Sequence, residues 1–446
     1  MAASAQKAPL PRIVIVGGGA GGMELVTRLG DKLGARGQAQ VVLVDQSATH
    51  LWKPLLHEVA AGSMDASAHQ LEYAAQARWH HFQFQQGALL GVDRASRSIE
   101  VEAVHDDEGV EILPRRRLEW DLLVLAIGSV TNFFGVPGAR EHAYAIDTQA
   151  QAERFRRRLV AACMRAQNSM AEMVSHGLHP QVDIVIIGGG ATGVELAAEL
   201  RGTTQVLGAY GVHALDAQRD IHITIVEAGP RILPPLPEAL ALHTEHLLDD
   251  MHIRVLAGER VTEVSANEVR TESGRVLPAD LTVWAGGIEV ARVLADAGFA
   301  HNRLGQLQVE PGLQLQGETD IFAMGDCAAC AWLGRQGTVP PRAQAAHQQA
   351  DFLYHALQKK LQGRPFGQFQ YRDRGSLVSL GRYEVVGNLM GKMVGRAVRV
   401  EGFLARMLYI SLYRQHLMAL NGFVRMMLDW AVQWLRSKTR PRVKLH

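Results

Sequence analysis

A strand that runs into a glycine-rich turn near the start of the chain constrains the fold more than any other feature. Residues 12–16 are mostly β-branched and predict a short buried strand, and six small residues follow them. Gly17, Gly19 and Gly22 fill the G-x-G-x-x-G template, whose glycines allow a tight turn, the approach of a pyrophosphate and close helix packing. The diphosphate would lie at the positive end of the helix that follows. A second predicted strand ends at Asp45, where a ribose 2′-hydroxyl would be bound.

The same arrangement occurs a second time. The apolar residues 182–187 lead into a turn in which Gly188, Gly190 and Gly193 match the template, and the next predicted strand ends at Glu227. Two dinucleotide folds in one chain predict two dinucleotides held close to each other. That arrangement is typical of a flavoprotein that takes electrons from a nicotinamide.

The bulk composition excludes some classes of protein. With 446 residues, 47% of them hydrophobic and 20% charged, the chain is an ordinary globular α/β protein of two or three domains. A formal net charge of +1 argues against nucleic acid as a partner. The three cysteines, Cys163, Cys327 and Cys330, are too few for a disulfide framework and favour a reducing compartment. Cys327 and Cys330 form a C-x-x-C, for which an inert pair is favoured over a redox dithiol or half a zinc site; no metal is predicted.

Three further segments of the first fold are expected at the cofactor. The loop through His50 and Lys53 follows the second strand, on the side where open α/β sheets bind ligands. A strand over 121–125 ends in a turn of small residues, and another delivers Asp326, which would bind a ribityl hydroxyl or cap the next helix. The predicted cofactor contacts are Gly17, Gly18, Gly19, Ala20, Gly21, Gly22, Asp45, Gln46, His50, Lys53, Pro54, Leu55, Leu89, Ala126, Ile127, Gly128, Gly325, Asp326, Ala343 and Gln344. The predicted NAD contacts are Gly188, Gly189, Gly190, Ala191, Thr192, Gly193, Glu195, Glu227, Ala285, Gly286 and Gly287.

The remaining elements follow from periodicity. Alternating residues over 82–104 and 110–118 predict a small antiparallel sheet, and 147–170 predicts a helix with a solvated, arginine-rich face. A helix that opens at Ala343 places Gln344, His347 and Gln348 on one face. Such a face can donate hydrogen bonds to quinone carbonyls.

The end of the chain has the pattern of an interfacial membrane anchor. Residues 403–446 carry eight basic side chains and one acid, a balance of +7. Two helical stretches, 404–420 and 423–435, are rich in bulky apolar residues, and Trp430 and Trp434 lie one turn apart. This pattern predicts helices in the headgroup plane of an anionic membrane, with a dimer-forming or core-packing helix as the alternative. No signal peptide and no spanning run is recognisable, so the protein is expected on the cytoplasmic side.

Taken together, these motifs resemble those of a bacterial type II NADH:quinone oxidoreductase, and the resemblance extends nearly from end to end. It is carried by His50–Ala60, Gly188–Leu196, Val226–Gly229, Met324–Cys330, Pro340–Gln348 and Arg440–His446. The resemblance implies non-covalent FAD in the first fold and NADH in the second. It also associates the Ala-Gln-x-Ala-x-Gln motif, here Ala343 to Gln348, with the quinone, and Glu195 with the nicotinamide–flavin contact. The C-terminal helices of that family are taken to anchor it and often to form a dimer.

The sequence therefore predicts an α/β protein with two Rossmann-like dinucleotide-binding domains and a C-terminal amphipathic membrane-binding region. The expected domains are 1–147 and 301–350 for FAD, 148–300 for NADH and 351–446 for the C-terminal region. The expected function is hydride transfer from NADH to FAD and then two-electron reduction of a membrane quinone, without proton pumping, by a monotopic protein at the cytoplasmic face of the inner membrane. Glu195, Gln344 and Gln348 are the candidate catalytic residues, and Gln344, His347 and Gln348 the candidate quinone ligands.

Three alternatives remain. A disulfide reductase would need a redox dithiol over the flavin, and neither 50–62 nor the nicotinamide fold offers a cysteine pair. A sulfide:quinone oxidoreductase would not need the intact second glycine motif with Glu227. A membrane-tethered NADH-sensing or structural flavoprotein would bind the same dinucleotides without turnover.

Overall fold

The structure is a computed structural model. It describes residues 9–175, 180–207, 215–381, 385–390 and 397–401 and, in the tail, residues 407, 411, 414, 416–420, 422, 427, 428 and 432. These residues form two compact units, each with its own parallel sheet. The first unit comprises Met1–Trp52, Gln70–Val130 and Glu289–Arg372; the second comprises Lys53–His69, Thr131–Ile288 and Asp373–His446.

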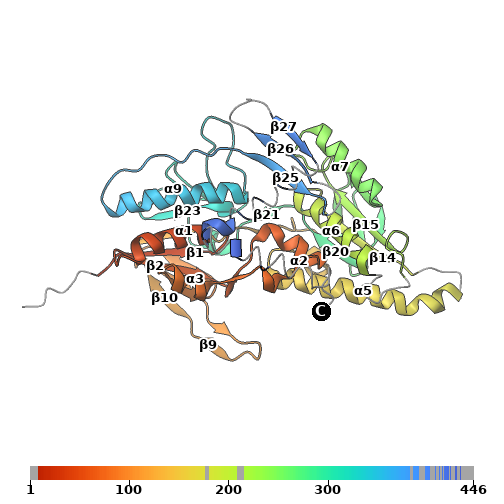
Figure 1. The fold of residues 1–446 in the computed structure, drawn as a ribbon, viewed down its shortest axis with the longest axis horizontal. Coiled ribbons are helices and arrows are strands. Elements are labelled where there is room, and N and C mark those ends of the chain that lie inside the picture. Colours follow the sequence, from red (N-terminus) through yellow and green to blue (C-terminus); the bar gives the residue numbers. More distant parts are fainter. Residues whose placement is uncertain are drawn as a thin grey trace, which may run out of the picture. The chain divides into compact units, whose positions relative to one another are not determined.

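The first unit is built on a five-stranded parallel sheet, visible beneath α9 in Figure 1. Three of its strands, at residues 13–16, 41–44 and 122–125, are rows of Val, Ile and Leu buried on both faces, as the inner strands of a parallel sheet covered by helices must be. The strand order is β23 (Ile321–Ala323), β11 (Leu122–Leu125), β1 (Arg12–Val16), β2 (Gln40–Asp45) and β5 (Gln83–Gln86). The long helices of this unit are α1 (Ala20–Leu29), which continues as a π-helix over Gly30–Gly34, α3 (Tyr73–Trp79) and α9 (Ala343–Leu361).

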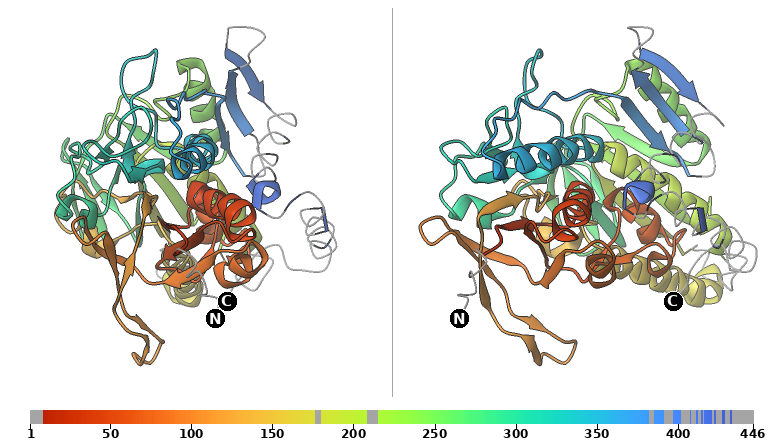
Figure 2. Two further views of the ribbon diagram at one scale, coloured as in Figure 1. Left: turned by 90° about the vertical axis from the view of Figure 1, so that its left-hand side faces the viewer. Right: turned by 60° about the vertical axis from the view of Figure 1, so that its left-hand side comes forward.

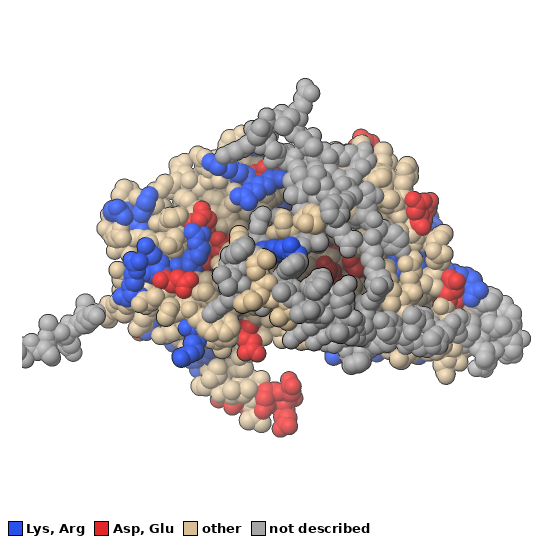
Figure 3. Space-filling model, in the orientation of Figure 1, with Lys and Arg blue, Asp and Glu red and all other residues tan. Residues whose placement is uncertain are grey.

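An antiparallel region lies between β5 and β11 in the chain. It consists of a three-stranded sheet and a projecting hairpin whose end carries acidic side chains, seen at the lower edge of Figure 3. The sheet is β6 (Leu89–Asp93), β7 (Ser98–Val101) and β10 (Arg116–Glu119), and the hairpin is β8 (Val104–His105) and β9 (Glu111–Leu113). The prediction of an antiparallel sheet is correct here except at its start. β5 pairs in parallel with β2, because its alternating residues suit an edge strand of either kind.

The second unit repeats the design of the first. Its parallel sheet has the order β13 (Ala143–Tyr144), β20 (Leu281–Trp284), β14 (Val182–Ile187), β15 (Ile221–Glu227) and β16 (Ile253–Ala257). The helices of the unit are α2 (Leu56–Ala61), α4 (Ala139–His142), α5 (Gln149–Ser175), α6 (Ala191–Leu207) and α7 (Glu238–Asp250). Two antiparallel sheets complete it: β17 (Val261–Val264), β18 (Glu268–Thr271) and β19 (Val276–Pro278), then β25 (Gly375–Ser379), β26 (Val385–Met390) and β27 (Ala397–Glu401).

Short elements connect these sheets and helices. The chain also forms β3 (Thr49–His50), β4 (Leu71–Glu72), β12 (Val130–Thr131), β21 (Ile288–Glu289), α8 (Arg292–Asp296), β22 (Leu307–Gln308), β24 (Ala328–Ala329) and 3₁₀ turns over Lys53–Leu55, Ala66–Ala68 and Gly325–Cys327. The α/β class with two dinucleotide folds is therefore confirmed.

The predicted anchor lies largely outside the described residues. Among those that are described, 416–420 are helical, with His416 and Leu420 buried and Met418 exposed. The tryptophan pair and most of the basic residues of the tail fall outside them. No helix of the described chain combines the length and the apolar character that a membrane span requires.

Candidate functional site

The first glycine turn joins β1 to α1 at the carboxyl edge of the first sheet. Gly17 has φ +103° and passes against the backbone of Ala126, which follows the neighbouring strand β11, so any side chain at Gly17 would clash. A Cβ on Gly22 would likewise clash with the carbonyl oxygen of Gly17. A Cβ on Gly19, in contrast, would meet nothing within 4 Å. α1 begins at Ala20, with Gly19 as its N-cap, and has no side-chain cap and no acid in its first turn. This open cradle of backbone N–H groups fits a diphosphate.

The middle peptide of this turn is held by three side chains. The Gly18 amide donates to Oδ2 of Asp45 at 2.6 Å. The Gly18 carbonyl accepts from the Tyr73 hydroxyl and lies 2.8 Å from Nδ1 of His50, which donates as the Nδ1–H tautomer. Burial lowers the pKa of His50 to about 4, so the ring is neutral. Burial raises the pKa of Asp45, although the amides of Gly18 and Ser47 oppose the shift. His50 thus braces the turn that the sequence places at the cofactor.

Asp326 occupies the same edge of the sheet, directly after β23. Its carboxylate accepts from Ser129 Oγ at 2.7 Å, and its carbonyl accepts from Gln306 Nε2 at 2.9 Å. The preceding Gly325 has φ +71°, and its amide donates to Oε1 of the buried Gln349 at 2.7 Å. The predicted ribityl ligand is therefore fixed by three residues, Ser129, Gln306 and Gln349, that the sequence alone does not single out.

The other predicted contacts divide between the two units. Ala126, Ile127 and Gly128 follow β11 in the first unit, where Leu89 begins β6 and Gln46 follows β2. Lys53, Pro54 and Leu55 belong to the second unit. There the Lys53 ammonium lies 3.3 Å from Oδ1 of Asp147, whose other oxygen accepts from the Thr131 amide.

The polar face at the start of α9 is present, and two of its side chains, His347 and Gln348, already contact other parts of the protein. Nδ1 of His347 lies 2.6 Å from Oε2 of Glu24 in α1. The Gln348 side-chain amide donates to the Arg372 carbonyl and accepts from the Arg372 amide, each at 2.9 Å. Ala343 and Gln344 are half-buried. The structure thus brings Gln344, His347 and Gln348 together on one helix, as predicted.

The second glycine turn has the same geometry as the first. Gly188 has φ +112° and passes against the backbone of Ala285 and Gly286 after β20, and a Cβ on Gly190 would meet nothing within 4 Å. Both oxygens of Glu227 are used: Oε2 accepts from the Gly189 amide and Oε1 from the Gly229 amide, each at 2.6 Å. α6 begins with Ala191 and Thr192, which lie between Gly190 and Gly193. Gly287 is the last residue of the loop that follows β20. This turn is a second open cradle for a dinucleotide.

Glu195, in the second turn of α6, lies in a buried acidic cluster. Oε1 accepts from the Ser379 amide at 3.0 Å, and Oε2 lies 3.9 Å from Nδ1 of His57 in α2. Burial is the largest cause that raises the pKa of Glu195 to about 8; the Ser379 amide opposes it, while Glu58 and Glu199 reinforce it. Burial and Glu199 likewise raise the pKa of Glu58 to about 8. Burial lowers the pKa of His57 to about 4. Near neutral pH this cluster holds protons on its carboxyl groups.

Cys327 and Cys330 are both buried free thiols. The Cys327 thiol donates to the carbonyls of Met324 and Leu125, at 3.2 and 3.4 Å, and burial raises its pKa to about 12. Burial raises the pKa of Cys330 to about 11. Within the described part of the chain, no three His, Cys, Asp or Glu residues are grouped so that they could hold a metal. These thiols lack the thiolate character that redox or metal chemistry needs.

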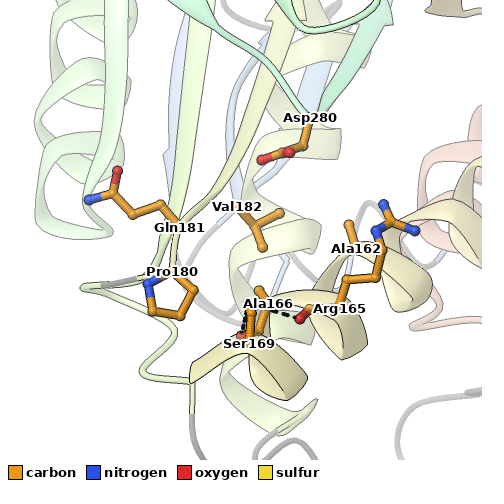
Figure 4. A pocket seen from close by; sticks show the side chains of 8 residues that line it. All are labelled: Ala162, Arg165, Ala166, Ser169, Pro180, Gln181, Val182 and Asp280. Carbon is orange, nitrogen blue, oxygen red and sulfur yellow. Dashed lines mark hydrogen bonds between the residues drawn. The ribbon is translucent and has the colours of Figure 1, made fainter. Parts of the chain in front are cut away.

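The second unit has a surface pocket away from its glycine turn (Figure 4). It is found at the amino ends of β14 and β20, whereas the glycine turn of this unit lies at their carboxyl ends. Its lining residues are Ala162, Arg165, Ala166, Ser169, Pro180, Gln181, Val182 and Asp280. Asp280 has a structural role, because its carboxylate accepts a hydrogen bond from the Asp183 amide at 2.8 Å.

Several residues that complete the sites were missed by reasoning from the sequence. Tyr73, Gln306 and Ser379 come from segments distant in the chain, and no local pattern marks them. Ser129 and Gln349 directly follow predicted site residues, so their position next to Gly128 and Gln348 was an available signal.

Comparison with known proteins supports one family. Residues 11–350 match the family described as pyridine nucleotide-disulphide oxidoreductase. A type II NADH:quinone oxidoreductase of Haemophilus influenzae is 40% identical over 446 residues, which span 98% of this chain and 100% of that protein. A protein of the same name from Staphylococcus saprophyticus is 27% identical over 85% of this chain and 90% of its own length.

A solved structure is similar to this chain in fold. The structure of NDH2 from Plasmodium falciparum in complex with NADH has a TM-score of 0.77 and 18% identity, and the match covers 98% of this chain and 100% of that one. With 40% identity over nearly its whole length, the chain belongs to the type II NADH:quinone oxidoreductases, within the pyridine nucleotide-disulphide oxidoreductase family.

Proposed function

We propose that the protein is an NADH:quinone oxidoreductase that uses non-covalent FAD and pumps no protons. One observation carries the proposal: the chain has two open glycine cradles, and in each the amide of the second glycine donates a hydrogen bond to a carboxylate. The relatives named above support the choice of substrates. In this assignment residues 1–147 and 301–350 hold FAD, 148–300 hold NADH and 351–446 form the C-terminal region.

The first cradle suits FAD. The backbone amides around Gly19 and the uncapped start of α1 would hold the pyrophosphate, and Asp45 would accept the ribose hydroxyl. Asp326, which Ser129 orients through a hydrogen bond, would accept a hydrogen bond from a hydroxyl group of the ribityl chain. When bound, FAD would supply the redox chemistry, taking a hydride from NADH and passing two electrons to the quinone.

The second cradle suits NADH. Gly190 leaves room for the pyrophosphate at the start of α6, and the Glu227 carboxylate would accept the 2′-hydroxyl of the adenine ribose. A carboxylate there repels the 2′-phosphate of NADPH. The acid therefore selects the coenzyme.

Quinone reduction also consumes protons. Conversion of NADH and quinone to NAD⁺ and quinol takes up one proton from solution in addition to the hydride. Glu195 carries its proton on a carboxyl oxygen near neutral pH and can release it, because burial holds its pKa at about 8. We assign Glu195 this proton-holding role, and Gln344 and Gln348 the binding of quinone.

A disulfide reductase is the competing enzyme class. It would require a thiolate over the flavin, and burial keeps the pKa of Cys327 and Cys330 at about 12 and about 11. The thiols would therefore stay protonated and unreactive at neutral pH. The third cysteine, Cys163, is buried and has no other cysteine near it in the sequence.

We further propose that residues 403–446 hold the protein on the cytoplasmic face of the inner membrane as a monotopic protein, with homodimer formation through the same region. The +7 balance of this segment and its bulky apolar residues support the proposal. This arrangement would bring the enzyme to a quinone dissolved in the bilayer.

Rapid mixing under anaerobic conditions tests the function. NADH should bleach the flavin absorbance near 450 nm, and a water-soluble quinone should restore it. A flavin that NADH bleaches and only a disulfide reoxidises would indicate a disulfide reductase. A flavin that NADH binds without bleaching would indicate a sensor.

A further inference from the structure

Helices α1 and α9 of the first unit lie side by side, as Figures 1 and 2 show. They approach each other closely at the first turn of α1, next to the glycine cradle. A Cβ on Gly21 would lie 2.8 Å from the carbonyl oxygen of Ala346 and would also clash with the side chain of Met324. Because the obstacle is the backbone of α9, the position of α9 is tied to the turn that would hold the pyrophosphate.

A network of polar and charged side chains fastens the two helices one turn further along. Glu24 of α1 is 8% exposed, and its Oε2 lies 2.6 Å from Nδ1 of His347 in α9. Its Oε1 lies 3.3 Å from Arg28, which also pairs with Asp351 of α9 at 2.8 Å. A carboxylate this buried is costly unless its oxygens are paired, so loss of the His347 ring removes the 2.6 Å partner of Oε2 and leaves the carboxylate to Arg28.

The same stretch of α9 also holds the loop that carries Asp326. Gln349, two residues after His347, is buried, and its Oε1 accepts a hydrogen bond from the Gly325 amide at 2.7 Å. Gly325 adopts φ +71°, a left-handed conformation, immediately before Asp326. A shift of α9 would therefore move Asp326 as well as the first turn of α1.

We propose that Glu24 and His347 are positioning residues for the flavin. Their pair keeps α9 on α1, so that the phosphate cradle and Asp326 stay in register around one cofactor. The proposal rests on the proposed binding of FAD in the first unit. It gives His347 a role that differs from the quinone contact expected from its place in the Ala-Gln-x-Ala-x-Gln motif.

A double-mutant cycle on flavin release tests the pair. Holoproteins with Glu24→Gln, His347→Ala and both changes are diluted, and released FAD is followed by its fluorescence. Lys359→Ala is the matched control, because this lysine lies on the same helix and is exposed. Release should be about tenfold faster in each single variant, and no faster in the double variant than in the single variants, while Lys359→Ala stays within about twofold of the parent protein.

Two further measurements separate positioning from general damage. His347→Gln, whose amide can still donate to Glu24, should restore slow release, and the KM for NADH should stay unchanged in every variant. If the single variants lose their circular dichroism signal, Glu24→Asp replaces Glu24→Gln in the cycle.

Two results would overturn the proposal. One is additive effects of the two changes on FAD release. The other is an unchanged release rate in His347→Ala together with a raised KM for quinone, which would make His347 a quinone ligand. A parent protein that holds no FAD would instead refute the proposed function.

Discussion

The Glu227 carboxylate accepts a hydrogen bond from the backbone amide of Gly189 at 2.6 Å. The acid that would select the coenzyme is therefore also part of the glycine turn. The matching bond between Gly18 and Asp45 in the first unit has the same length. In both units the acid is positioned before any dinucleotide arrives, which lowers the cost of ordering the site.

Glu227→Gln should reduce the preference for NADH over NADPH. The parent protein should use NADH far better, because the carboxylate accepts a ribose hydroxyl and repels a 2′-phosphate. The variant keeps an oxygen for the Gly189 amide and loses the charge. Comparing kcat/KM for the two coenzymes checks this, and comparable values in the parent protein would contradict it.

Gly19→Val and Gly190→Val should separate the two cofactor sites. Neither Cβ meets a protein atom within 4 Å, so both variants should fold and fail only where a ligand must approach. Gly19→Val should be purified without FAD, whereas Gly190→Val should keep FAD and lose reduction by NADH. Flavin absorbance and NADH titration measure the two effects.

The control for these variants is Gly22→Ala. A Cβ on Gly22 would clash with the Gly17 carbonyl, so this small change should lower the unfolding temperature with or without ligand. A Gly19→Val protein with a full complement of flavin would show that the first unit does not bind FAD in this way.

Gln344→Leu and Gln348→Leu should slow the reoxidation of reduced flavin by quinone. Flavin reduction by NADH should change little, because NADH is assigned to the second cradle. Gln348 also holds the Arg372 backbone, so its replacement should lower the unfolding temperature as well. Stopped-flow measurement of each half-reaction checks this, and equal slowing of both halves would indicate a folding defect.

Glu195→Gln should raise the unfolding temperature more at pH 8 than at pH 5. Burial, reinforced by Glu58 and Glu199, raises the pKa of Glu195 to about 8, so the folded protein binds this proton more tightly than the unfolded chain does. Stability from this group is therefore lost as the pH rises from about 4.5 to about 8, by on the order of 1 kcal/mol per pH unit. The amide has no such dependence. Thermal melts with the exposed Glu111→Gln as control test this, and an equal shift at both pH values would contradict it.

Removal of residues 403–446 should leave a soluble protein that still reduces water-soluble acceptors with NADH. Each basic residue near an anionic surface contributes about 1 kcal/mol, and buried apolar side chains add to it. High salt should therefore release only part of the full-length protein from vesicles. Sedimentation with vesicles at low and high salt measures this. Complete release by salt would mean a purely electrostatic contact, and binding of the truncated protein would locate the anchor elsewhere.

The two cradles were predictable because their chemistry is local. Gly17 and Gly188 adopt a positive φ and pass against backbone, so the template marks the turn itself. Asp45 and Glu227 follow from the length of one strand–helix–strand unit. For the same reason, the helical spacing of Gln344 and Gln348 was enough to predict that they lie on one helix face.

The partners of these residues were not predictable, because they depend on contacts between distant segments. The Ser379 amide reaches Glu195 from 184 positions away, and Glu24 reaches His347 from 323. Lys53 illustrates the same limit, because no sequence pattern links it to Asp147, whose Oδ1 lies 3.3 Å from its ammonium. β5 was misassigned because four alternating residues fit an edge strand in either direction.

The buried thiols have a practical consequence for following the tail of the protein. Burial raises the pKa of Cys163, Cys327 and Cys330 to about 11 or 12, so at pH 8 only ~0.1% or less of each is the thiolate that reacts with maleimides. The native cysteines therefore need not be replaced before site-specific labelling. A single Met427→Cys change, at a side chain that is exposed in the tail, would give one fluorescent reporter whose quenching by lipid-bound probes measures its depth in a bilayer.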